Sequence, residues 1–489
     1  MTITDTPPIL TKEECQELVT RIGQYTRGGG DTSIIIHSAW NRELRWARNH
    51  VTVSGDRRVP YIKVVRTIKD AHGEALTNQT DPVSLESVVR CAERSASILP
   101  NHLPDDFNPG NPLFDYSTST VWSAATNTST VESRGALARL LTEEAEQRSM
   151  LSAGYLEMRA TAFASVSVQT EKYAGMSAQP QSTTVQGLAA RMHYVQFTQS
   201  QCSMTVRHPK GTGSGWAGLS SYDWTTIDAP ALAQRALDKC LRSLNAVRIE
   251  PGRYTVVLEP QAVANLVELL FVGGGSGSLF SREMAEGGGG PFVAGYDQNL
   301  GLLRSKLGLQ VVDQRLTLAH DPTDPFLGVP PSLGLQPVVW IKDGVLQTLN
   351  FDRRYSVSAL NSSNPAGFRQ SFRLSGGTTT IDDMIASTKR GLLVSRFSNL
   401  RVLDEASVLA TGVTRDGLWL IENGKISKAV NNMRITESPL FVLNQIEHLG
   451  VPVPVFRPDK SPLSAQLQPA VVPPITARDF SFTATIDAV

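Results

Sequence analysis

Helical periodicity marks several segments of the first 250 residues. Thr11-x-x-Glu14 is a capping box, and the apolar spacing behind it predicts an amphipathic helix at the start of the chain. The same period predicts further helices over 85–92, 137–145 and 229–244. Strand-like alternation or β-branched runs predict strands over 33–37, 43–53, 59–68, 155–168 and 190–207. This part of the chain therefore predicts a mixed domain of helices and antiparallel strands.

The pattern of hydrophobic and polar positions changes at Pro251-Gly252, where we place a domain boundary. A buried strand over 254–258 and an apolar helix over 261–272 follow. Beyond them strands dominate, over 309–316, 338–350, 392–403, 408–411, 418–426 and 479–489, interrupted by helices over 381–389 and 439–449. We therefore predict an α+β protein of two domains. A mixed α/β domain occupies 1–250, and a β-rich domain with a proline-rich connector at 452–474 occupies 251–489.

Composition narrows the function classes. Lys plus Arg and Asp plus Glu number 46 each, so no net charge attracts a polyanion, and a nucleic-acid role gains no support. No stretch approaches the roughly 20 apolar residues of a membrane span, and the first ten residues lack the features of a signal peptide. The four cysteines form no C-x-x-C pair, which favours reduced thiols and a cytoplasmic protein over a disulfide framework or a zinc knuckle.

Motifs of familiar catalytic sites are missing from the sequence. The eight histidines never fall within two helical turns of each other, so neither H-E-x-x-H nor H-E-x-x-x-H can be written. The glycine run at 273–277 lacks the lysine of a phosphate-binding loop, and neither Ser276 nor Ser214 has the flanking glycines of a nucleophile elbow. Asp382-Asp383 lies in the first turn of a predicted helix, where carboxylates interact favourably with the helix dipole, so a structural role is the simpler interpretation.

An ordered set of segments resembles the TldD/PmbA family. The set comprises 44–53 in the N-terminal half and 251–264, 339–346, 381–393, 416–425 and 479–489 in the C-terminal half. The resemblance covers most of the chain and is strongest beyond residue 250. It implies a two-domain protein of the TldD/PmbA type, with a β-rich C-terminal domain.

The resemblance also implies where a metal site would lie. Members of the TldD type carry a H-E-x-x-x-H helix and a later glycine-cysteine motif, which hold one metal in a peptidase for small or unfolded peptides. Aligned on that helix, this chain has Val267 and Val272 at the histidine positions and Glu268 at the position of the catalytic glutamate. Val413 stands where the cysteine would be. Because all three ligand positions hold valine, we expect this chain to bind no metal and to contribute no catalytic residue.

The expected role follows from the metal-less TldE/PmbA type of the family. Gly273, Gly274, Gly275 and Arg415 are the predicted lining of a substrate cleft. The chain is expected to pair, as a heterodimer or higher heteromer, with a TldD-type subunit that binds zinc, and to shape a cleft for a peptide or small amide substrate. Two alternatives stay open. One is a metal-independent hydrolase or transferase acting on a small amide-containing secondary metabolite, and the other is a stand-alone scaffold or regulator.

Overall fold

Helices and strands are both extensive in the protein, as expected for an α+β fold. The computed structural model describes residues 9–27, 30–68, 71–98, 121–168, 192–211, 213–271, 279–286, 288–297, 302–321, 324, 326–327, 337–350, 371–457 and 469–486. Below, the described residues up to 242 are called the N-terminal half, and those from 252 onward the C-terminal half. The α+β class predicted from the sequence is confirmed.

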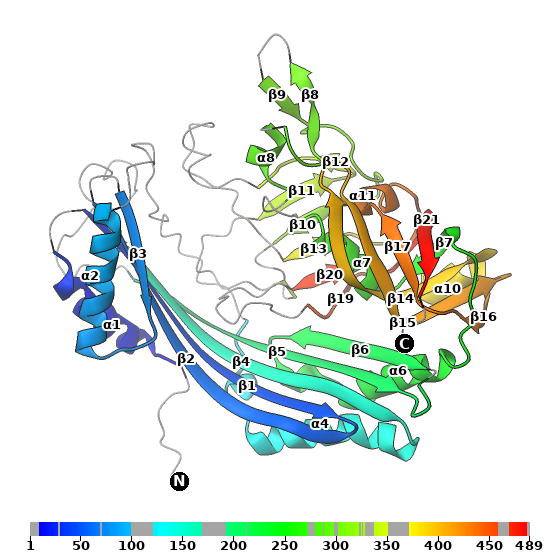
Figure 1. Ribbon diagram of the computed structural model, residues 1–489, viewed down its shortest axis with the longest axis horizontal. Helices are drawn as coiled ribbons and strands as arrows, with labels where there is room; N and C mark the ends of the chain where they lie inside the picture. Colours follow the sequence, from blue (N-terminus) through cyan, green and yellow to red (C-terminus); the bar gives the residue numbers. More distant parts are fainter. Residues whose placement is uncertain are drawn as a thin grey trace.

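A curved sheet of six antiparallel strands, the long sheet, spans the N-terminal half (Figure 1). Its spatial order is β3-β2-β1-β4-β5-β6. The strands are β1 (Asp31–Ala47), β2 (His50–Ile68), β3 (Ala71–Thr77), β4 (Leu151–Val168), β5 (His193–Arg207) and β6 (Ser214–Ser221). A tight turn at Arg48 and Asn49, both with positive φ, joins β1 to β2. The single strand predicted over 43–53 is therefore wrong, because the chain reverses at its centre.

Helices cover one face of the long sheet at both of its ends. They are α1 (Lys12–Tyr25), α2 (Pro82–Ile98), α3 (Ala124–Asn127), α4 (Val131–Gln147) and α6 (Ala229–Arg242), with a 3-10 helix η2 at Trp224–Thr226. α1 begins at the predicted capping box, in which Thr11 Oγ1 accepts from Glu14 N and Glu14 Oε2 accepts from Thr11 N. α1 and α2 pack around Ile34 and Ile62, whereas α4 and α6 pack around Leu44. Burial of these apolar faces provides the main stabilisation of both ends.

Three further sheets build the C-terminal half. Seven strands form one sheet, β7 (Gly252–Leu258), β14 (Arg390–Asp404), β15 (Leu409–Glu422), β16 (Lys425–Ala429), β17 (Met433–Glu437), β18 (Ile446–Leu449) and β21 (Ile475–Thr485). Six short strands form another, β10 (Leu318–His320), β11 (Val338–Lys342), β12 (Val345–Leu346), β13 (Phe372–Leu374), β19 (Val453–Pro454) and β20 (Ala470–Val472). The remaining pair is β8 (Val293–Asp297) and β9 (Leu302–Ser305). The helices are α7 (Pro260–Glu268), α8 (Arg282–Glu286), α10 (Ile381–Ser387) and α11 (Pro439–Val442).

Local predictions in the C-terminal half are partly wrong. Residues 309–316 are irregular, with turns, bends and one isolated β-bridge from Gln310 to Val345, and do not form a strand. The two strands predicted over 408–411 and 418–426 are one strand, β15, followed by β16. The helix predicted over 439–449 has only the four residues of α11, and β18 follows, because pairing with β21 competes with the helix there. No described helix combines the length and apolarity needed to cross a membrane.

The face of the long sheet opposite its helices points toward the C-terminal half (Figure 1). Phe456 marks the contact, since its ring lies edge-on to Tyr155 of β4 and Trp216 of β6, with centroids 5.9 and 5.6 Å apart. Gln261 of α7 holds this segment by two hydrogen bonds to the Phe456 backbone, at 3.0 and 3.1 Å. At this contact the two halves meet through α7, the chain around Phe456, and strands β4 and β6.

Candidate functional site

Helix α7 carries the first of the residues singled out in the sequence. It begins with Pro260 at its first turn, where the missing N–H costs nothing, and packs on β14. Asn265 Oδ1 accepts a hydrogen bond from Phe397 N of β14 at 3.3 Å, which fixes the helix on the strand. Val267 is 0% exposed and belongs to the largest hydrophobic cluster of the C-terminal half. Its side chain is a core residue and has no atom that could bind a metal.

Glu268, the last residue of α7, faces a buried arginine. Arg457 Nη2 lies 3.5 Å from Glu268 Oε1, and the two side chains are 3% and 20% exposed. The Arg457 guanidinium carbon is 5.1 Å from the centroid of the Phe372 ring, a cation–π contact. Burial lowers the pKa of Arg457, and the charge of Glu268 opposes that shift. Glu268 therefore neutralises a cation in the protein interior.

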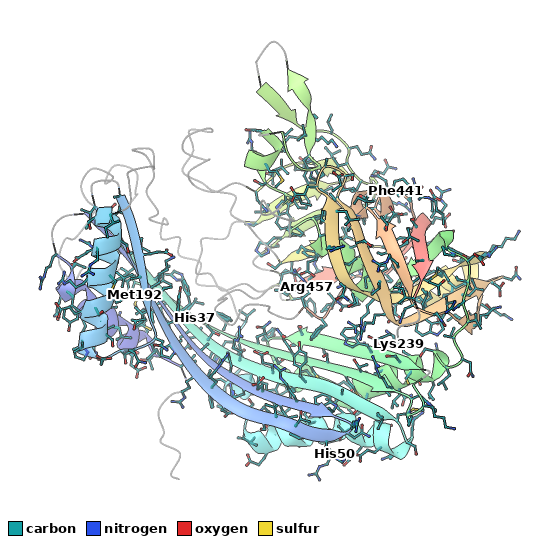
Figure 2. All side chains as sticks on the ribbon, viewed as in Figure 1. His37, His50, Met192, Lys239, Phe441 and Arg457 are labelled. Carbon is teal, nitrogen blue, oxygen red and sulfur yellow. The ribbon has the colours of Figure 1, made fainter. Side chains whose placement is uncertain are left out.

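Arg457 is a residue that the sequence reasoning missed. It lies in the proline-rich connector, far from α7 in the sequence, and nothing in its local pattern distinguishes it from a solvated arginine. Its place follows from the fold, because Gln261 fixes the preceding residue and Arg457 N donates to Ser220 Oγ of β6 at 3.3 Å. In Figure 2, Arg457 lies at the edge of the C-terminal half that is nearest the long sheet.

Val413 and Arg415 lie in β15, away from Val267. Val413 pairs with Ser398 of β14, and the next residue, Thr414, pairs with Phe397 of the core that α7 joins. Because side chains alternate along a strand, Val413 points to the face opposite Thr414. The structure thus does not bring Val413 onto the face where α7 packs.

Arg415 is 39% exposed and lies 3.9 Å, Nε to Oδ2, from Asp416. The remaining sequence-predicted positions, Val272, Gly273, Gly274 and Gly275, lie outside the described residues. Within the described part of the chain, no three histidine, cysteine, aspartate or glutamate side chains come together as a possible metal site. The carboxylate that α7 carries is that of Glu268, which faces a guanidinium. This environment does not fit a zinc ion.

A band of polar side chains lies on the face of the long sheet that points toward the C-terminal half. We call it the polar floor, and its members are His37, Asn41, Glu157, Arg159, Thr161, Gln199 and Gln201. Strand register brings them together, since Asn41, Arg159 and Gln199 are direct neighbours across β1, β4 and β5. Gln201 pairs with Ser220, the residue that binds the Arg457 backbone. The polar floor therefore extends to the Glu268–Arg457 pair.

Several polar-floor atoms have unused hydrogen-bonding capacity. His37 Nε2, Asn41 Oδ1 and Thr161 Oγ1 are buried and have no hydrogen-bond partner among the described residues. Burial, with the charge of Arg159, lowers the pKa of His37 to about 4, so the ring is neutral at pH 7. Figure 2 places His37 on the long sheet. A neutral imidazole, an amide and a hydroxyl offer donors and acceptors that suit the N–H and C=O groups of an amide.

Comparison with known proteins supports a common fold over the whole chain. TldE from Thermococcus kodakarensis is 13% identical with a TM-score of 0.72, covering 96% of this chain and 99% of that one. A candidate modulator of DNA gyrase from Bacteroides thetaiotaomicron is 16% identical with a TM-score of 0.71, covering 97% and 99%. A second candidate gyrase modulator, from Thermotoga maritima, is 13% identical with a TM-score of 0.70, covering 97% and 100%. At these identities the likeness establishes the fold.

The sequence of the C-terminal half gives the family. A search of curated protein sequences finds no match to this chain. Residues 251–483, however, match the family described as the PmbA/TldA metallopeptidase C-terminal domain. The matched segment contains α7, β15 and the buried Arg457, and the N-terminal half shares its fold with the solved structures. By this C-terminal domain the chain belongs to the TldD/PmbA family, and over its whole length it shares the fold of TldE from Thermococcus kodakarensis.

Proposed function

We propose that this chain is the metal-less subunit of a heteromeric TldD/TldE-type metallopeptidase, in which a TldD-type partner holds the zinc. The observation that carries the proposal is the ion pair between Glu268 and Arg457 at the end of α7. A glutamate that activates metal-bound water must face the metal. Here the carboxylate faces a guanidinium that is 3% exposed, and a zinc ion beside it would add further positive charge to a buried cation.

The packing of α7 supports the same proposal. Val267 fills the core with no exposed surface, so the helix is stabilised as an apolar packing element. A metal site that had lost one ligand would leave an unpaired donor, whereas valine in a well-packed core leaves none. We infer that α7 in this chain has a structural role, and that the chemistry of the complex belongs to the partner.

The polar floor holds the hydrogen-bonding groups that this chain could offer to a peptide, and its amides are buried in the lone chain, with Asn41, Gln199 and Gln201 8%, 7% and 3% exposed. Asn41, Gln199 and Gln201 carry amides that both donate and accept hydrogen bonds, which matches a peptide backbone irrespective of its side chains. Small or unfolded peptides expose such groups, whereas folded proteins satisfy them internally.

We place the complex in the cytoplasm, where the four free cysteines would stay reduced.

Co-expression with a TldD-type subunit from the same source tests the proposal. We expect the two chains to co-purify as a complex that binds zinc and cleaves an unfolded peptide, while the lone chain binds no stoichiometric zinc and cleaves nothing. Assembly is measured by light scattering after gel filtration, zinc by mass spectrometry, and cleavage by chromatography.

Matched variants locate the chemistry. E268Q in this chain should leave the turnover number of the complex unchanged, whereas replacing the metal-helix glutamate of the partner should abolish cleavage. A melting curve of E268Q verifies that the chain still folds after losing its ion pair with Arg457. Stoichiometric zinc in the lone chain, or a loss of turnover in folded E268Q complex, would contradict a metal-less role.

A further inference from the structure

A concave site lies at the junction of the two halves, away from Glu268. It is a cavity of about 550 Å³, within the range of small-molecule sites. Its lining comes from α6, the start of α7, residues 378–381 and strands of the C-terminal half, and we call it the junction pocket. Glu259 and Pro260 border it, whereas Glu268 ends the same helix about 13 Å further on, at 1.5 Å per residue. The junction pocket is therefore separate from the Glu268–Arg457 pair.

One face of α6 supplies the charged wall of the junction pocket. Four charged residues of α6 have the i, i+3, i+4, i+7 spacing of a single helix face, and all four line the cavity. They are Arg235, Asp238, Lys239 and Arg242. The opposite, apolar face of α6 is buried against the long sheet. Lys239 of this charged stripe binds Glu259 and Ser395, so the stripe faces the C-terminal half.

The positive charge of this wall is only partly neutralised. Lys239 Nζ lies 2.5 Å from Glu259 Oε2 and donates to Ser395 Oγ at 2.7 Å, so its charge is compensated (Figure 2 labels Lys239). Arg235 and Arg242 are exposed, and neither forms an ion pair among the described residues. With Asp238 as the remaining acid, the lining has a net charge of one positive unit, and two guanidiniums are available to an anion.

The facing wall is apolar and partly uncovered. Leu393, Trp419 and Ile426 line it, and Val451 and Val453 are 57% and 40% exposed. Exposed aliphatic side chains next to a cavity present apolar surface that a ligand can cover, at roughly 25 cal/mol per Å². Trp419 joins the two walls, because its Nε1 donates to the carbonyl oxygen of Arg242 at 3.0 Å.

We propose that the junction pocket binds a small amphipathic anion, with an aliphatic or aromatic body against Trp419 and Val451 and a carboxylate or phosphate on Arg235 and Arg242. The charge of the wall selects an anion, the opposite wall selects an apolar body, and the volume selects a small molecule over a protein segment. Because α6 belongs to one half and Trp419 to the other, an occupant contacts both halves. Its binding stabilises the native chain by mass action.

Isothermal titration of the purified chain with a fixed set of probes tests the proposal. Decanoate carries a carboxylate on an aliphatic body, and N-acetylphenylalanine carries one on an aromatic body. Phenyl phosphate carries a phosphate on an aromatic body. As controls, decanol lacks the anionic group and inorganic phosphate lacks the apolar body. We expect at least one amphipathic anion to bind, and decanol and inorganic phosphate to bind about tenfold more weakly or not at all.

Variants connect the binding to the pocket. R235Q/R242Q should weaken the best probe about tenfold or more, and V451E, which adds a like charge to the apolar wall, should also weaken it. R401Q removes an exposed arginine of β14 outside the pocket and should leave the affinity unchanged. The proposal is overturned if no amphipathic anion binds, if decanol binds as tightly, or if R235Q/R242Q matches R401Q. None of these outcomes depends on a metal-bearing partner, so failure here is distinct from failure of the proposed function.

Discussion

The hydroxyl of Ser214 on β6 donates a hydrogen bond to Oδ1 of Asp416 on β15, joining residues 202 positions apart. The other carboxylate oxygen, Oδ2, accepts from Nε of Arg396 at 2.9 Å and also from its Nη2. Asp416 has a φ of +56° and lies opposite the register shift between Val394 and Arg396. This bulge turns the Asp416 carboxylate, which is 2% exposed, toward the N-terminal half. The carboxylate therefore binds Ser214 of the N-terminal half and Arg396 of the C-terminal half.

Replacing Asp416 should therefore weaken the protein more than a surface substitution. D416N removes the charge that pairs with Arg396, and breaking a buried pair of this kind costs about 3 kcal/mol. S214A removes one charge-assisted hydrogen bond and should cost about 1.5 kcal/mol. Urea unfolding measures both, with D382N at an exposed position of α10 as the control. A D416N chain as stable as D382N would show that the bulge does not hold the halves together.

The adjacent glycine should be equally intolerant. Gly417 has a φ of +141°, and an added Cβ would lie 2.2 Å from the Trp419 ring. Gly295 of β8 has a similar φ of +131°, but no atom in the described part of the chain lies within 4 Å of an added Cβ. G295A therefore measures backbone strain alone, about 1 kcal/mol, and G417A should cost about 3 kcal/mol. Equal losses of stability in G295A and G417A would show that the contact between the added Cβ and the Trp419 ring costs no stability.

Two arginines buried beneath the long sheet depend on one carboxylate. Arg42 of β1 and Arg134 of α4 are both 0% exposed, and Asp56, the cross-strand neighbour of Arg42, forms an ion pair with Arg134. Burial, together with the charge of Arg134, lowers the pKa of Arg42 to about 10, and Asp56 opposes this shift. D56N should destabilise the chain by about 1 kcal/mol, because the Asp56 carboxylate is 37% exposed and solvent screens its pairing with Arg134. Thermal melts of D56N beside D382N check this, and similar melting temperatures would contradict it.

Local signals account for what the sequence predicts well. The capping box at Thr11 and Glu14 fixes the start of α1 by contacts three residues apart, so the sequence pattern contains the whole device. Amphipathic α4 and α6 follow from apolar spacing in the same way. Local sequence signals do not predict the turn at Arg48 and Asn49, because this turn contains neither Gly nor Pro. Asn49 instead bonds to residues about one hundred positions away, with Oδ1 accepting from Ser152 N at 2.6 Å.

The candidate site depends on contacts that no local pattern contains. Val267 and Glu268 can be located through family resemblance, but the partner of Glu268 is Arg457, 189 residues later and in a proline-rich connector. The polar floor is likewise assembled by register, since Asn41 meets Arg159 only once β1 pairs with β4. Strand pairing over more than a hundred residues is decided by the whole fold, and a single sequence does not reveal it.

Acid should destabilise the chain through His37, the polar-floor residue on β1. Its ordinary pKa is 6.5, and in the folded chain burial and the charge of Arg159 lower the pKa to about 4. Below pH 6.5 the unfolded chain therefore binds more protons than the folded chain, and stability falls as the pH drops from about 6.5 toward 4. The ring is 3% exposed, so solvent does not screen the effect, and the loss between pH 7 and pH 5 should be about 2 kcal/mol.

Comparison with a variant isolates this contribution from the other titrating groups. H37N keeps a polar side chain that is neutral at every pH, so its free energy of unfolding should fall about 2 kcal/mol less than that of the parent between pH 7 and pH 5. H50N, at the exposed start of β2, tests whether the loss of any histidine has the same effect. Urea unfolding at several pH values measures all three chains. If parent and H37N lose stability in parallel, His37 is not held neutral, and the polar floor is more hydrated than its burial implies.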